Sequence, residues 1–152
     1  HYTIEGFLNS GGFGITYLAK DSLDRTVVIK ECFPNALCRR STSLVRARSR
    51  KHQGDFRGFV ESFVAEAKSL ARLVHPNIVG VHQVFEDNDT AYMAIDYIDG
   101  RDLHDILDST DHAFTPDQIV TMLEDQRRRL VERVDLNRQV VRFSAARWNR
   151  GS

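Results

Sequence analysis

The sequence predicts an α+β domain in which five antiparallel strands form one sheet and a single long helix packs against it. Three short apolar runs come first, a helical apolar stripe follows, and two more apolar runs flank a polar turn. Short connections of this kind join antiparallel neighbours, and a sheet covered by one helix is a stable two-layer arrangement. At 152 residues the chain is long enough to bury a core.

The first three strands are expected at residues 2–8, 15–19 and 26–30. The glycine-rich stretch 9–14 separates the first two, and the polar run 21–25 separates the second from the third. The third segment, Thr-Val-Val-Ile-Lys, is rich in β-branched side chains, which favour strands. This order predicts an antiparallel meander.

Residues 31–58 carry seven Arg or Lys residues and show little apolar periodicity. We interpret them as a basic, partly mobile insert before the long helix, with Phe33 and Pro34 as its anchor. The Ser and Thr residues at 41, 42, 43 and 49 lie among arginines, so they are candidate phosphoacceptors. A solvated basic loop is the simpler interpretation.

Residues 59–74 are the clearest helix, because apolar side chains recur there at spacings of three and four. The stripe consists of Phe59, Phe63, Ala67, Leu70 and Val74. Glu66 lies on the same stripe, and a carboxylate that faces a core is costly unless it is paired. Pro76 disfavours helical geometry at His75, so the helix is expected to end there.

The remaining elements follow from shorter patterns. Residues 78–85 and 90–97 predict a second hairpin around a polar turn, and residues 102–107 predict a short helix. Thr115-Pro116-Asp117 opens a last helix, with Thr115 as its N-cap. The expected organisation is a lobe at residues 1–107, the start of a further helical segment at 108–123, and a tail at 124–152.

Composition excludes several function classes. Hydrophobic residues make up 41% of the chain and charged residues 28%, and the net charge is zero. The net charge of the chain therefore creates no field that favours binding to nucleic acid or to a membrane surface.

Cys32 and Cys38 are the only cysteines. The spacing of this lone pair is unlike that of zinc sites, so we expect reduced thiols and no metal site. No apolar run approaches the length of a membrane span.

The glycine-rich stretch and Lys30 together predict a polyphosphate site. Glycines allow the backbone to approach phosphate oxygens, and a lysine at the end of the third strand supplies a compensating charge. Lys30 and Glu66 both need partners, and each is a natural partner for the other. A fixed pair would direct the ammonium group toward the phosphates.

In these residues the chain resembles the small, nucleotide-binding lobe of bacterial serine/threonine protein kinases over residues 2–107. Three stretches carry the resemblance: Gly-Gly-Phe-Gly-Ile-Thr-Tyr at 11–17, His-Pro-Asn-Ile-Val at 75–79, and residues 92–100. The resemblance implies binding of ATP. It also implies that the complete domain transfers the γ-phosphoryl group from ATP to a protein Ser or Thr, with Mg²⁺.

The resemblance also implies roles for individual residues. Lys30 would contact the phosphates and Glu66 would hold Lys30. Ile95 would be the gatekeeper, and Asp102 would bind the ribose. The Asp96 carbonyl and the Ile98 amide would meet the adenine edge. The loop residues are Asn9, Ser10, Gly11, Gly12, Phe13 and Gly14, and the residues that would sandwich the adenine ring are Leu8, Thr16 and Val28.

Three positions depart from the family pattern. Asn9 replaces the first loop glycine, and asparagine is the next best residue where a positive φ is wanted. Thr16 stands where the family prefers Val, and Val28 replaces a smaller Ala and would narrow the adenine slot. We expect these changes to affect affinity more than the fold.

The family's His-Arg-Asp, Asp-Phe-Gly and Ala-Pro-Glu motifs do not occur in the sequence. The candidate base and the magnesium ligands are therefore missing. We expect the chain to be inactive alone. The alternative is a non-catalytic, pseudokinase-like module that binds a partner chain.

The tail at 124–152 contains eight Arg, no Lys and four acidic residues. Three interpretations of this tail are open: a native helix that packs on a partner, a non-native segment after a truncation or frame change, and a basic arm for an acidic ligand. The all-arginine composition favours the non-native segment. Nucleic acid is the weakest partner, because no aromatic residue interleaves with residues 127–129. An uncovered face of the lobe would favour self-association. A cytoplasmic location is expected, with a membrane anchor elsewhere in a longer protein left open.

Overall fold

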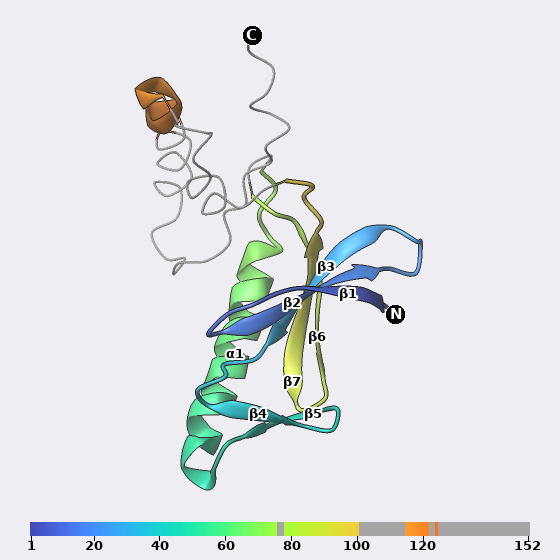
Figure 1. The fold of residues 1–152 in the computed structure, drawn as a ribbon, viewed down its shortest axis with the longest axis vertical. Helices are drawn as coiled ribbons and strands as arrows, with labels where there is room; N and C mark the ends of the chain where they lie inside the picture. The colour runs from blue at the N-terminus through green and yellow to red at the C-terminus, as the bar shows by residue number, and fades with distance from the viewer. Residues whose placement is uncertain (76–77, 101–114, 122–123, 125–152) are drawn as a thin grey trace. The chain divides into compact units, whose positions relative to one another are not determined.

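The computed structural model describes residues 1–75, 78–100, 115–121 and 124. By their contacts the residues divide into two compact units, 1–97 and 98–152. The first unit carries the sheet and the long helix (Figure 1). The expected helix at 102–107 and nearly all of the tail lie outside the described residues.

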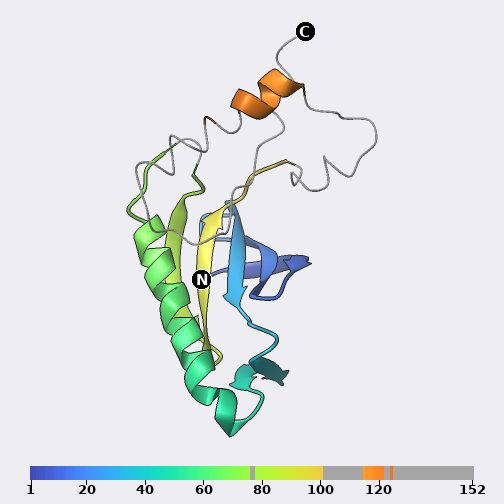
Figure 2. The ribbon, with the colours of Figure 1, turned by 90° about the vertical axis from the view of Figure 1, so that its left-hand side faces the viewer.

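The sheet of the first unit has five strands in the order β1-β2-β3-β7-β6, and every neighbouring pair is antiparallel. Its strands are β1 (Thr3–Ser10), β2 (Gly14–Lys20), β3 (Thr26–Cys32), β6 (Val81–Asp87) and β7 (Thr90–Asp96). One long helix, α1 (Gln53–Leu70), contacts β6 and β7, and runs alongside them in Figure 2. The predicted sheet with one long helix is therefore confirmed.

Two hydrophobic clusters lie on opposite faces of this sheet. On the helix face, Val28, Met93 and Ile95 pack with two side chains of α1, Phe63 and Ala67. On the other face, which we call the outer face, Ala19, Val27, Ile29 and Ala94 pack with the rings of Tyr2, Tyr17 and Tyr92. Because successive residues of a strand point to opposite faces, β3 contributes to both clusters.

The long helix begins and ends earlier than the apolar stripe predicts. It starts at Gln53 and ends at Leu70, and Val74 is fully exposed. Its first two turns contain Gly54 and Gly58, which weaken a helical pattern in sequence, although Phe56 is buried there. The expected stop at Pro76 concerns a residue outside the described ones.

Residues 31–58, which the sequence predicts as a basic insert, contain regular secondary structure after the end of β3. They form a hairpin of β4 (Cys38–Ser41) and β5 (Leu44–Ala47), a short 3₁₀ helix η1 (Arg50–His52) and the start of α1. Cys38 and Val45 pack with Phe56 of α1 in a third cluster, to which Phe33 also packs. Four-residue strands are too short to show a period-2 pattern, so the sequence pattern did not reveal the hairpin.

The start of the helix in the second unit agrees with its capping pattern. Residues 116–121 are helical, the Gln118 N–H donates to Thr115 Oγ1 at 3.3 Å, and the Thr115 N–H donates to Gln118 Oε1 at 2.8 Å. These reciprocal bonds form a capping box, which confirms Thr115 as the N-cap. Among the described helices, none is long and apolar enough to cross a membrane.

Gly14 is required by the close approach of β2 to β3. It pairs with Cys32, and a Cβ added to Gly14 would lie 2.6 Å from the backbone oxygen of Glu31. An added Cβ at Gly11 or Gly12 would meet nothing within 4 Å. The three glycines of the turn therefore have different roles: Gly14 allows sheet packing, while the other two leave an open surface.

Phe56→Ala is expected to lower the free energy of unfolding by about 3–5 kcal/mol, because it empties the cluster between α1 and the hairpin. Arg57→Ala is the matched control, since its side chain is 83% exposed. Urea unfolding measures both. A loss below about 1 kcal/mol for Phe56→Ala would show that residues 31–58 do not pack as described.

Gly14→Ala is expected to destabilise the fold by about 1–3 kcal/mol, because the new methyl group must displace a backbone oxygen. Gly12→Ala is its control, since open space surrounds that position. Thermal unfolding of the two variants checks this difference. Equal midpoints would contradict the close approach of the two strands.

Candidate functional site

Four predicted site residues lie on the helix face of the sheet. The register pairs Thr16 with Lys30 and Lys30 with Met93, and in the next row it pairs Leu18 with Val28 and Val28 with Ile95. Directly paired residues share a face. Since Val28 and Ile95 pack against α1, the side chains of Thr16 and Lys30 belong to that face too.

Lys30 lies between the glycine turn and α1. Its Cε lies 3.8 Å from the position that a Cβ on Gly14 would take. Burial lowers the pKa of Lys30, and the negative charge of Glu66 opposes that shift. On α1, Glu66 lies about one turn after Phe63 and directly before Ala67, and both of these residues are buried. The negative charge of Glu66 therefore acts on Lys30, while the functional roles of both residues stay predictions.

The turn between β1 and β2 is closed by one backbone hydrogen bond, from the Gly11 N–H to the Gly14 carbonyl at 2.9 Å. Asn9 and Ser10 belong to β1, and Asn9 has no positive φ. The expectation that Asn9 serves at a positive φ is therefore wrong. Asn9 pairs with Thr16 instead, and its carbonyl accepts a hydrogen bond from Thr16 Oγ1 at 3.1 Å.

Phe13 attaches the tip of the turn to two other segments. Its ring stacks on Phe59 of α1 with a centroid distance of 5.8 Å and an angle of 5° between the planes. Its carbonyl accepts a hydrogen bond from the Phe33 N–H at 3.2 Å, just beyond the end of β3. The turn therefore contacts α1 and the residue that follows β3, although Phe13 is 53% exposed.

Asp96 holds the end of β7 to the start of β6. Its Oδ2 accepts a hydrogen bond from the Gly80 N–H at 2.7 Å, and its Oδ1 lies 2.8 Å from His82 Nε2. A Cβ on Gly80 would lie 2.6 Å from the carboxylate, so a larger residue there would displace the side chain of Asp96. The side chain of Asp96 is thus occupied, while the predicted role concerns its carbonyl.

The remaining predicted nucleotide-binding residues are Leu8, Ile98 and Asp102. Leu8 lies at a register shift of β1 and is 37% exposed. Ile98 belongs to the second unit, and Asp102 lies outside the described residues. Their roles in binding the base and the ribose stay predictions.

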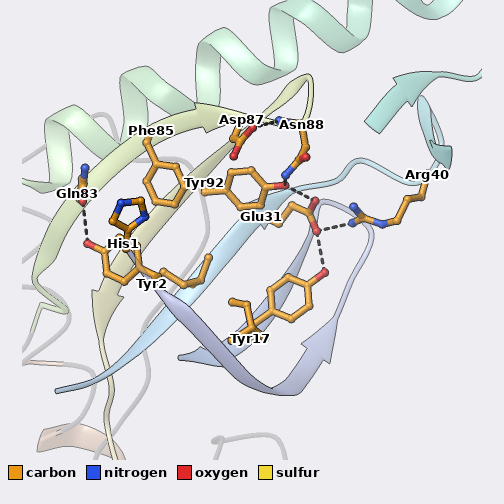
Figure 3. A pocket seen from close by; sticks show the side chains of 12 residues that line it. His1, Tyr2, Tyr17, Glu31, Arg40, Gln83, Phe85, Asp87, Asn88 and Tyr92 are labelled. Atoms are coloured by element: carbon orange, nitrogen blue, oxygen red, sulfur yellow. Dashed lines mark hydrogen bonds and ion pairs between the residues drawn. The ribbon is translucent and has the colours of Figure 1, made fainter. Parts of the chain in front are cut away.

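A second site, which sequence reasoning missed, lies on the outer face. A cavity of about 620 Å³ is lined there by three stacked aromatic rings, Tyr2, Phe85 and Tyr92, and by Glu31 and Arg40 (Figure 3). Glu31 is only 1% exposed. Strand alternation could have indicated the position of Glu31, because the residue after Lys30 must point to the opposite face of the sheet. A carboxylate that is buried there needs partners.

The two cysteines are free thiols, and both are buried. Burial raises the pKa of Cys32 to about 12 and that of Cys38 to about 11. Metal coordination requires the thiolate, which these environments disfavour. In the described ranges, no three His, Cys, Asp or Glu residues gather in a way that could hold a metal ion.

Comparison with known proteins gives consistent matches. The family model "Protein kinase domain" matches residues 2–126. The chain is 32% identical to the serine/threonine-protein kinase PknD of Chlamydia abortus over 109 residues, which is 72% of this chain and 10% of that protein. It is 35% identical to PksC of Streptomyces coelicolor and 30% identical to PrkC of Bacillus subtilis, over 70% of the chain in both cases. It spans 17% and 14% of those two serine/threonine-protein kinases.

Solved structures agree with this fold. The apo form of PpkA-294 superposes with a TM-score of 0.69 at 34% identity, covering 72% of this chain and 40% of that one. Rad53 residues 1–466 superpose with a TM-score of 0.55 at 21% identity, covering 76% of this chain and 26% of that one, which shows the fold alone. The family model covers most of the chain. The chain therefore belongs to the protein kinase domain family.

Proposed function

We propose that this chain binds ATP on the helix face of its sheet, as the nucleotide-binding lobe of a serine/threonine protein kinase. The observation that carries the proposal is the position of Lys30: its Cε lies 3.8 Å from the place that a Cβ on Gly14 would take, and the negative charge of Glu66 acts on it. The named relatives are serine/threonine-protein kinases, and the Rad53 structure that shares this fold is a complex with AMP-PNP.

Each part of the helix face has a separate task in this proposal. The open backbone at Gly11 and Gly12 lets phosphate oxygens approach its N–H groups. Lys30 supplies the positive charge, and Glu66 directs it. Thr16, Val28 and Ile95 form apolar surface for the base, which Leu8 would cover from β1, and the Asp96 carbonyl and the Ile98 amide would meet its edge. Asp102 would bind the ribose.

The chemistry of the complete domain would be transfer of the γ-phosphoryl group from ATP to a Ser or Thr of a protein substrate. The 152 residues contain no His-Arg-Asp, Asp-Phe-Gly or Ala-Pro-Glu motif, and the described residues hold no cluster that fits magnesium. We propose that this chain binds nucleotide and does not itself complete the transfer. Its protein partner would be a substrate, or a second chain on an uncovered face.

Lys30→Met is expected to weaken ATP binding by about tenfold or more, since a charged contact to phosphate contributes about 1.5–3 kcal/mol. Adenosine affinity and the unfolding midpoint should change little. Calorimetric titration with each ligand measures this, with Lys68→Met, an exposed lysine of α1, as the control. Unchanged ATP affinity in Lys30→Met would refute the assignment of the phosphate site.

Glu66→Gln is expected to weaken ATP binding more than adenosine binding, because Lys30 then loses the charge that directs it. Glu61→Gln removes a carboxylate on the exposed side of the same helix and serves as the matched control. The same titrations give both affinities. Equal losses for ATP and adenosine would show that Glu66 supports the fold of the pocket rather than the phosphate contact.

A further inference from the structure

Glu31 is a buried carboxylate immediately after Lys30 on the central strand of the sheet. Strand alternation places Lys30 on the helix face and Glu31 on the outer face. Glu31 is 1% exposed, and charged side chains are almost never buried this fully unless they are paired. β3 therefore carries two adjacent charges whose stabilising partners lie on opposite sides of the sheet.

Two tyrosines connect Glu31 to both strands that flank β3. Tyr17 of β2 donates its hydroxyl to Glu31 Oε2 at 2.8 Å, and Tyr92 of β7 donates to Oε1 at 3.0 Å. Asn88 donates in turn to the hydroxyl of Tyr92 at 3.2 Å. Figure 3 shows both tyrosine hydroxyls directed at the carboxylate. The carboxylate thus fastens three neighbouring strands at the level of Lys30.

Arg40 of the β4–β5 hairpin supplies the compensating charge. Its Nη2 lies 2.6 Å from Glu31 Oε2, and its guanidinium lies over the ring of Phe33 at 5.1 Å. Its Nη1 donates to the Ser43 carbonyl at 3.4 Å, which fixes the guanidinium against its own hairpin. Removing one partner of such a pair leaves the other as an uncompensated buried charge, which is strongly unfavourable.

The backbone of Glu31 is also the surface on which the glycine turn rests. The carbonyl oxygen of Glu31 leaves no room for a Cβ at Gly14. Glu31 itself pairs with Ile15 of β2 in the sheet register. Two residues further, the Phe33 N–H bonds to the Phe13 carbonyl. A shift of β3 at Glu31 would therefore move Lys30 and the glycine turn together.

We propose that Glu31 and Arg40 are positioning residues for phosphate binding: their ion pair on the outer face fixes the segment of β3 that carries Lys30 and supports Gly14. The inference rests on the proposed function, because it concerns the same phosphate site. It assigns a role in nucleotide binding to the β4–β5 hairpin, none of whose residues is among the predicted nucleotide contacts. The role is indirect, through the position of β3.

The test uses calorimetric titration of the full chain with ATP and, separately, with adenosine. Arg40→Met removes the charge and keeps the length of the side chain, Arg40→Lys restores a charge, and Arg39→Met removes the neighbouring exposed charge of the same strand. For Arg40→Met we expect ATP affinity about tenfold weaker, equivalent to about 1.4 kcal/mol, and adenosine affinity within about twofold of the parent. Arg40→Lys should recover most of the loss, and Arg39→Met should bind as the parent does.

A double-mutant cycle separates positioning from general loss of structure. In the Lys30→Met background, Arg40→Met should cause a smaller loss of ATP affinity relative to adenosine than it causes in the parent, because the ammonium group it positions is absent and only its support of the glycine turn remains. Thermal unfolding of each variant shows whether the fold persists. If Arg40→Met proves too unstable to titrate, Tyr17→Phe, which removes only one hydrogen bond to Glu31, gives a smaller loss in the same direction.

Three results would overturn the inference. ATP and adenosine affinities of Arg40→Met could fall equally, ATP affinity could stay unchanged while the unfolding midpoint drops, or the losses in the double mutant could simply add. Each of these leaves the proposed function standing if the parent chain binds ATP. Failure of the parent to bind ATP would overturn the proposed function, and this inference with it.

Discussion

The central constraint on this fold is that β3 carries two adjacent charged residues in the middle of a sheet. Lys30 and Glu31 point to opposite faces, and neither can be desolvated cheaply without an opposite charge. Glu66 of α1 provides the charge for Lys30 on one face, and Arg40 of the hairpin provides it for Glu31 on the other. The small hairpin is thus joined to β3 by an ion pair, and α1 carries a negative charge that acts on the lysine of the same strand.

This arrangement connects packing to the proposed chemistry. The helix face combines an apolar surface with the ammonium group of Lys30, which suits a ligand that has a flat base and a charged phosphate chain. On the outer face, the hydrogen bonds of Glu31 reach the two strands beside β3. The hydroxyl of Tyr17 is a donor to Glu31 at neutral pH, and burial raises its pKa further, to about 12.

Much of the sheet and the helix face could be predicted from local sequence patterns. The β-branched run before Lys30, the apolar stripe through Phe63 and Ala67, and the polar turn before Thr90 each indicate their element without distant information. That the charge of Glu66 acts on Lys30 could be expected from the cost of leaving either charge alone, while a fixed pair stays a prediction. The cap at Thr115 could be predicted because a capping box lies within four consecutive residues.

The outer face could not be predicted in the same way. Glu31 stands at the end of a strand, and its partners come from three other elements, including a hairpin of two four-residue strands. No periodicity connects Arg40 to Glu31, since only the folded hairpin brings them together. Asn9 shows a different limit, because the sequence suggests a residue that tolerates positive φ, whereas the register places it in an extended strand opposite Thr16.

The most direct measurement is covalent labelling with an acyl phosphate of ATP, followed by mass spectrometry of the peptides. A lysine amine held near the phosphates attacks the acyl carbon, forms an amide and releases the nucleotide. The account predicts that the label lies on Lys30 and that excess ATP prevents it, while Lys20, Lys51 and Lys68 stay unlabelled or react without protection. Labelling that is absent at Lys30, or that ATP does not reduce, would contradict a phosphate site on the helix face.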